Sequence, residues 1–178
     1  MACEEVTSGR KLPCNDQRGG IKYIDFVPFA EYGFVSTAEE IATIPAAITE
    51  VFRYEVKATT NTLTETATTS QDNGTTEYAG ALAVTLTKIN APTQVQLKAL
   101  LHGRAIAFVW DYNGNVNVLG IDSGVYGTTS TKATGGAGGD LSGYTLALAS
   151  MDSRYSPLLT SAAKTALNAL VSDVVITP

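Results

Sequence analysis

Apolar residues recur at every second position along much of the chain, and this spacing predicts β-strands with one buried face. The clearest case is the run in which Leu82, Val84 and Leu86 alternate with alanine and threonine. In a second run, Phe52, Tyr54 and Val56 alternate with charged residues. The predicted strands are 21–27, 51–57, 59–69, 75–89, 105–111, 116–121, 125–132 and 144–151.

Two turn signals connect neighbouring strands directly. Asn113-Gly114 is typical of a two-residue hairpin turn, and Asp72-Asn73-Gly74 is the strongest turn signal in the chain. The second of these sequences predicts a long hairpin whose first arm and tip occupy residues 59–77. This first arm is rich in threonine and has almost no apolar residues, so its preference is for extended backbone without a core-forming face.

Two segments have the spacing of a helix. The first begins at Pro92 and Thr93 and ends at Gly103, and the second covers 161–171. Residues 29–35 are compatible with a short strand or a loop. Residues 36–40 have capping-box chemistry and predict at most one helical turn.

These elements predict a mainly β fold. We expect an antiparallel β-sandwich or barrel with one or two flanking α-helices and a long extended hairpin. Residues 1–20 are polar and lack periodicity, so we interpret them as an N-terminal arm, and residues 21–178 as one β-rich domain. Its last residues, 173–177, have an extended pattern.

The composition excludes several classes of function. Only 16% of the 178 residues are charged and the net charge is −5, which argues against a sequence-reading nucleic-acid binder. No signal peptide or membrane span is expected. The chain should therefore be made in the cytosol, where Cys3 and Cys14 are expected to be free thiols rather than a disulfide.

Little of the sequence supports catalysis or metal binding. There is one histidine, His102, at the predicted end of the first helix, and the glycine cluster at 135–139 lacks the residues of a phosphate-binding loop. No recognisable triad surrounds the aspartates, although carboxylates that meet only in space escape a sequence search. We therefore expect no enzyme activity, no cofactor and no metal.

The threonine-rich hairpin is the main candidate functional feature. A hairpin of this length is not stable alone in water, so it either disorders or pairs with strands of another copy. We interpret it as an assembly device. The candidate assembly residues are Thr60, Thr62, Thr64, Glu65, Thr66, Thr68, Asp72, Asn73, Gly74 and Thr76.

Residues 50–152 resemble a bacteriophage virion structural protein. The similarity is carried by YAGALAVTLTK at 78–88, TQVQLKALL at 93–101, RAIAFVWD at 104–111 with its Asn-Gly turn, and GGDLSGYTLAL at 138–148. In their order these runs are similar to those of major tail proteins, which form tail tubes.

The resemblance implies a self-assembling subunit located in the virion tail. Hexameric rings would stack into a tube, other tail proteins would be its partners, and DNA would pass through the bore without sequence-specific binding. Two alternatives remain open. One is a capsid decoration, neck or tail-terminator protein, and the other is a ligand-binding β-sandwich of the virion.

Overall fold

A computed structural model describes residues 8–57, 60–172 and 176 of the chain. These residues form eleven strands and two helices, joined by turns and loops. They follow one another as β1 (Ile21–Pro28), β2 (Ser36–Thr37), β3 (Glu40–Ile41), β4 (Phe52–Glu55), β5 (Thr62–Ser70), β6 (Thr75–Thr87), α1 (Ala91–His102), β7 (Arg104–Asp111), β8 (Val116–Leu119), β9 (Val125–Ala133), β10 (Gly143–Asp152), β11 (Leu158–Leu159) and α2 (Ser161–Ala169).

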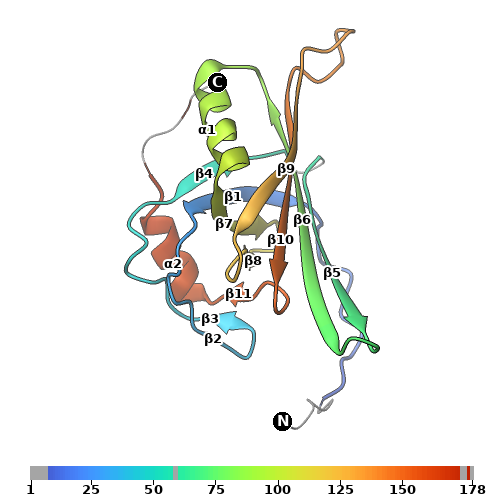
Figure 1. Ribbon diagram of the computed structural model, residues 1–178, viewed down its shortest axis with the longest axis vertical. Helices are drawn as coiled ribbons and strands as arrows, with labels where there is room; N and C mark the ends of the chain where they lie inside the picture. The colour runs from blue at the N-terminus through green and yellow to red at the C-terminus, as the bar shows by residue number, and fades with distance from the viewer. Residues whose placement is uncertain (1–7, 58–59, 173–175, 177–178) are drawn as a thin grey trace.

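The strands form one open, mostly antiparallel sheet, which confirms the mainly β prediction. Its order is β2-β3-β11-β8-β7-β9-β10-β6-β5, and β1 adds to the other edge of β7 with β4 outside it. The path does not close into a barrel. Instead, β9 leaves β7 after the pairs Arg104–Tyr126 and Ala105–Val125 and continues along β10, so the sheet folds over on itself (Figure 1).

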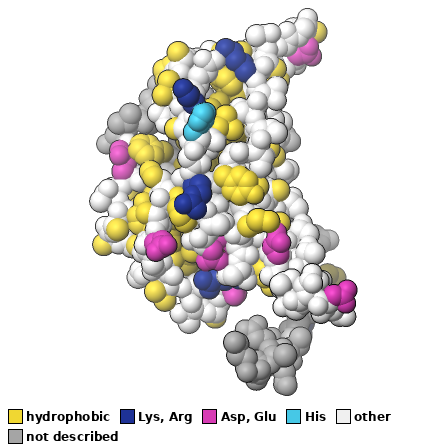
Figure 2. All heavy atoms as spheres, viewed as in Figure 1, with side chains coloured by type: hydrophobic (Ala, Val, Ile, Leu, Met, Phe, Trp, Pro, Cys, Tyr) yellow, Lys and Arg dark blue, Asp and Glu magenta, His cyan; other side chains and the backbone are white. Residues whose placement is uncertain are grey.

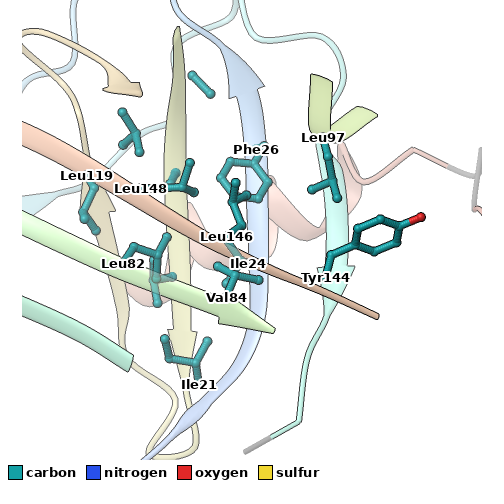
Figure 3. Packing of buried hydrophobic residues seen from close by; sticks show 14 residues of the cluster. Ile21, Ile24, Phe26, Leu82, Val84, Leu97, Leu119, Tyr144, Leu146 and Leu148 are labelled. Atoms are coloured by element: carbon teal, nitrogen blue, oxygen red, sulfur yellow. The ribbon is translucent and has the colours of Figure 1, made fainter. Parts of the chain in front are cut away.

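The first core lies between the two parts of this folded sheet. Ile24 and Phe26 of β1 face Leu82 of β6 and Leu146 and Leu148 of β10, and all five are at most 4% exposed (Figure 3). Each such side chain contributes about 2 kcal/mol through burial. The arrangement is that of a sandwich made from one continuous sheet.

A second core lies on the other face of β7. Because alternate residues of a strand point to opposite faces, Ala105, Ala107 and Val109 enter the first core while Ile106 and Phe108 enter the second. Against these last two residues pack α2 and the chain between β1 and β4. The central strand therefore has two buried faces.

The helix predicted to begin at Pro92 and Thr93 is α1, and Asn90 caps it by accepting a hydrogen bond from the Thr93 N–H at 2.9 Å. Its C-terminal turn packs against β9, where a side chain at Gly127 would overlap Leu101. The second predicted helix is α2, capped by Thr160.

The helical turn predicted at 36–40 was wrong. Ser36–Thr37 and Glu40–Ile41 form a small antiparallel hairpin, β2–β3. Its turn places Ala38 and Glu39 at φ 51° and 60°, the left-handed region that a helix does not use. Pairing of β3 with β11 outweighs the local capping preference. Residues 29–35 form a loop, one of the two expected alternatives, and most of 173–177 lies outside the described residues.

Candidate assembly surface

The hairpin predicted around Asp72-Asn73-Gly74 is β5–β6. Its register runs from Thr62 opposite Ala83 to Ser70 opposite Thr75. Strand β10 ends at Asp152, which lies opposite Tyr78, so residues 68–77 extend past the end of β10. The hairpin projects from the lower end of the molecule (Figure 1).

Strands β9, β10, β6 and β5 share an outward face made almost entirely of small uncharged residues. The residues that alternate with the buried Leu82, Val84, Leu146 and Leu148 point to this face. We call it the threonine–alanine face. It consists of Thr62, Thr64, Thr66 and Thr68 on β5, Ala79, Ala81, Ala83 and Thr85 on β6, Thr145, Ala147, Ala149 and Met151 on β10, and Tyr126, Thr129 and Thr131 on β9.

Rows of this face run across the strands. One row joins Thr64, Ala81, Ala149 and Tyr126, and its neighbour joins Thr62 with Ala83, Ala147 and Thr129. Glu77, opposite Thr68, adds a charge near the hairpin tip. Neutral side chains predominate along this side of the molecule over β9, β10 and the hairpin (Figure 2). The face has no cluster of charges, and its two large apolar side chains are Tyr126 and Met151, which are 39% and 49% exposed.

The opposite face of the hairpin holds it against the body of the subunit. Glu65 points inward, away from the threonines, and its two carboxylate oxygens accept hydrogen bonds from the backbone N–H and the hydroxyl of Ser156 at 2.9 and 2.6 Å. Next to it, the rings of Tyr78 and Tyr155 make an edge contact with centroids 4.8 Å apart. Glu65 is thus separated from the other candidate residues of β5.

A buried asparagine extends the pairing of β5 beyond its first residue. Asn61 is 2% exposed, and its Oδ1 accepts a hydrogen bond from the Thr85 N–H at 2.6 Å while its Nδ2 donates to the Lys57 carbonyl. The side chain takes the place of a strand partner for Thr85. A polar residue among threonines carries no sequence signal for this role, so the residue pattern did not reveal it.

The remaining candidates lie at the ends of the hairpin. Thr60 precedes β5 and is exposed. Asp72, Asn73 and Gly74 are in the turn, where Gly74 has a φ of 62°. Thr76 is exposed on β6, and its hydroxyl lies 3.2 Å from that of Thr69.

Two edges of this part of the sheet have no strand beside them in the described chain. No described strand pairs with the outer edge of β5, and β9 meets β7 only through Val125 and Tyr126, which leaves the outer edge of residues 127–133 without a strand. Free edges present unpaired backbone groups and are sites of pairing between chains. The four strands therefore have no further strand on either side, and the C-terminal turn of α1 packs against β9 at Gly127.

The other candidate residues have structural roles in the part of the chain that is described. Asp140 accepts hydrogen bonds from the N–H groups of Gly136 and Ala137, which lowers the pKa of its carboxyl and closes the glycine-rich connector between β9 and β10. His102 ends α1. No described group of histidine, cysteine, aspartate or glutamate is arranged to hold a metal ion.

Two aspartates lock the loop after β8 to the end of β10. Asp152 accepts hydrogen bonds from the N–H groups of Gly120 and Asp122. Asp122 in turn accepts from the hydroxyl and the N–H of Ser153 at 2.6 and 2.9 Å, and these two bonds hold its pKa below the ordinary value of 3.8. Both carboxylates are used in fixing loop geometry.

Cys14 is a free, exposed thiol, while Cys3 lies outside the described residues. Among the described helices, none has the length and apolar character needed to cross a membrane. No family model matches the chain, and neither a curated protein nor a solved structure matches it.

Proposed function

We propose that the protein is a structural subunit that assembles into rings stacked as a tube, the tail tube of a bacteriophage. The observation that carries the proposal is the four-stranded unit β9-β10-β6-β5, which has no further strand on either side and an outward face made mostly of threonine and alanine.

The two free edges favour a ring over a symmetric dimer. Suppose that the outer edge of β5 in one copy pairs with the outer edge of residues 127–133 of β9 in the next copy. This contact is head-to-tail, so the first copy keeps its β9 edge and the second copy keeps its β5 edge for further pairing. Such a contact closes into a ring or grows into a filament. Threonine and other β-branched residues on both strands suit this edge-to-edge pairing.

The threonine–alanine face then becomes the wall of the bore. A ring of these faces presents hydroxyl and methyl groups rather than lysine or arginine. Because DNA affinity for proteins arises mainly from neutralised phosphates, such a wall has no tight, salt-dependent hold on DNA. DNA passes through it without sequence-specific binding.

Electron microscopy of the purified protein tests the proposal. We expect rings or tubes in negative stain, and a sedimentation profile that shifts to large species as concentration rises. A protein that stays monomeric at millimolar concentration, without tubes, contradicts the proposal. If rings form but the backbone amides on the outer edges of β5 and β9 still exchange rapidly with solvent, the pairing of these two edges is contradicted. Ring assembly itself is not.

A further inference from the structure

Two asparagines of the sequence are followed by glycine, Asn73 in the β5–β6 turn and Asn113 in the β7–β8 turn. An Asn-Gly pair can react with itself, because the glycine nitrogen can attack the side-chain amide carbon of the asparagine. Glycine favours this step since it has no Cβ to hinder the close approach. The structure gives the two pairs different surroundings.

Asn73 lies in the projecting turn of the β5–β6 hairpin and is exposed, as is Gly74 (Figure 1). The Asn73 N–H lies 3.4 Å from Ser70 Oγ. Within the described residues, no hydrogen bond holds the Asn73 side-chain amide or the Gly74 N–H. A Cβ placed on Gly74 would meet no atom within 4 Å. The two reacting groups are therefore free to approach each other.

Asn113 and Gly114 are held by hydrogen bonds at both reacting groups. The Asn113 Oδ1 accepts from the Arg18 N–H at 2.9 Å, and the Gly114 N–H donates to the Asp111 carbonyl at 3.4 Å. The Asn113 N–H donates to Asp111 Oδ1 at 2.9 Å, and the Gly114 carbonyl accepts from Lys164 Nζ at 2.7 Å. Attack of the Gly114 nitrogen on the Asn113 side chain would first have to break some of these contacts.

We infer that Asn73 is a site of spontaneous deamidation and that its contacts protect Asn113 from the same reaction. In the first step, the Gly74 nitrogen forms a bond to Asn73 Cγ and the Cγ–Nδ2 bond breaks. The Nδ2 amine leaves as ammonia together with the proton of the Gly74 nitrogen, which leaves a five-membered succinimide ring. Solvent water then opens the ring at one of its two carbonyls and gives aspartate or isoaspartate.

Both products change the tip of the hairpin. Each adds a carboxylate beside Asp72 in the sequence. In isoaspartate the main chain runs through the former side chain, so the connection between the paired residues Ser70 and Thr75 becomes one bond longer. The inference goes beyond the proposed function, because the reaction occurs within one chain and requires no ring.

Peptide mapping of the full-length protein tests the inference. The folded protein is kept at mildly alkaline pH and digested with trypsin at successive times. Residues 58–88 and 105–132 form separate tryptic peptides, which contain Asn73 and Asn113. Mass spectrometry follows the exchange of NH₂ for OH at each site. We expect Asn73 to react at least about tenfold faster than Asn113, because the latter must first break hydrogen bonds of ordinary strength.

Unfolding provides the matched control, because it removes the contacts of both sites and leaves both Asn-Gly pairs intact. In guanidinium chloride the two sites should react at rates within about threefold of each other. Equal rates in the folded protein would overturn the inference. So would a tenfold preference for Asn73 that persists in the unfolded chain, since the contacts of Asn113 would then not be its cause.

Asn73→Gln tests the assignment of the site within its peptide. The longer glutamine side chain keeps the amide but cannot close the five-membered ring, so we expect the modification of peptide 58–88 to disappear. Continued modification of this peptide at the original rate would assign the reaction to Asn61 and overturn the site.

Arg18→Pro tests the cause of the protection at Asn113. Proline has no N–H, so Asn113 Oδ1 loses its donor, and we expect the Asn113 rate to rise about fivefold while the Asn73 rate stays unchanged. Arg18→Ala is the matched control, because it keeps the N–H and loses only the guanidinium over the Tyr112 ring. Circular dichroism checks that both variants are folded. An Asn113 rate that is the same in both variants would overturn the protective role of the Arg18 N–H.

Discussion

The guanidinium of Arg53 clasps the fully buried carboxylate of Asp25 with two parallel hydrogen bonds. Arg53 Nε and Nη2 each lie 2.7 Å from a carboxylate oxygen, and Trp110 Nε1 donates a third hydrogen bond to Asp25 at 2.6 Å. The bond to Asp25 raises the pKa of Arg53. Arg53 Nη2 also donates a hydrogen bond to Asn168 Oδ1 at 2.8 Å, so Arg53 links β4 to α2.

Replacing Arg53 alone should be costly. Arg53→Met leaves a buried carboxylate without its cation, and we expect the free energy of unfolding to fall by about 3 kcal/mol. Because Asp25→Leu removes that charge, the double variant should recover about half of the loss. Urea unfolding measures both. Lys22→Met, which removes an exposed cation over Tyr23 in the same sheet, should change stability by less than about 0.5 kcal/mol; a similar loss there would argue against the buried pair as the cause.

Shortening the hairpin should separate folding from assembly. Replacing residues 68–77 by Asn-Gly joins Ala67 to Tyr78 through a two-residue turn and keeps Leu63, Glu65 and their contacts. We expect monomer stability to change by less than about 1 kcal/mol, because all the removed residues except the half-buried Ser70 are exposed, while rings and tubes are lost. Thermal unfolding and negative-stain microscopy measure the two effects. Unchanged tubes would show that the projecting tip has no part in assembly.

A lysine on the threonine–alanine face should convert the bore into a DNA-binding surface. Ala81 is exposed between Thr64 and Ala149. If the face lines the bore, tubes of Ala81→Lys should retain double-stranded DNA at 50 mM salt and release it at 200 mM, because each ring adds one set of phosphate contacts. Tubes of Ala81→Gln are the matched control and should retain none. Fluorescence anisotropy of labelled DNA gives the result, and equal binding by both variants would place the face elsewhere.

The hydrogen bonds of Asp122 predict a pH-dependent contribution to stability. A carboxyl with a lowered pKa in the folded state stabilises it above the ordinary value of 3.8, and this contribution disappears as the pH falls through the lowered pKa. Ser153→Ala should therefore cost about 1 kcal/mol at pH 7, allowing for solvent screening of this exposed group, and progressively less below pH 4.

Ser123→Ala is the matched control for this effect. The Ser123 hydroxyl donates to the neutral carbonyl of Met151 at 2.6 Å in the same region. Its loss should lower stability by an amount that does not vary between pH 7 and pH 3. Parallel pH profiles for the two variants, measured by thermal unfolding, would mean that Asp122 is not the titrating group.

The hairpin and the strands around Leu82 and Leu146 were predictable because their alternation and turn residues are local signals. The threonine–alanine face was only half predictable. The threonines of β5 were identified, but Ala81, Ala149 and Tyr126 join them only through strand order, which residue spacing does not contain. Glu65 was also predicted together with the threonines, although alternation along β5 places its side chain on the opposite face.

Strand β7 has a consequence for how the subunit comes apart. Ala107 packs in the first core and Phe108 packs in the second. Because both residues belong to β7, the elements around one core cannot separate from β7 without disturbing the other core. The molecule should therefore melt in one cooperative transition, and the amide hydrogens of β7 should exchange with solvent only when the whole chain opens. A mechanical load that reaches either layer is shared by both.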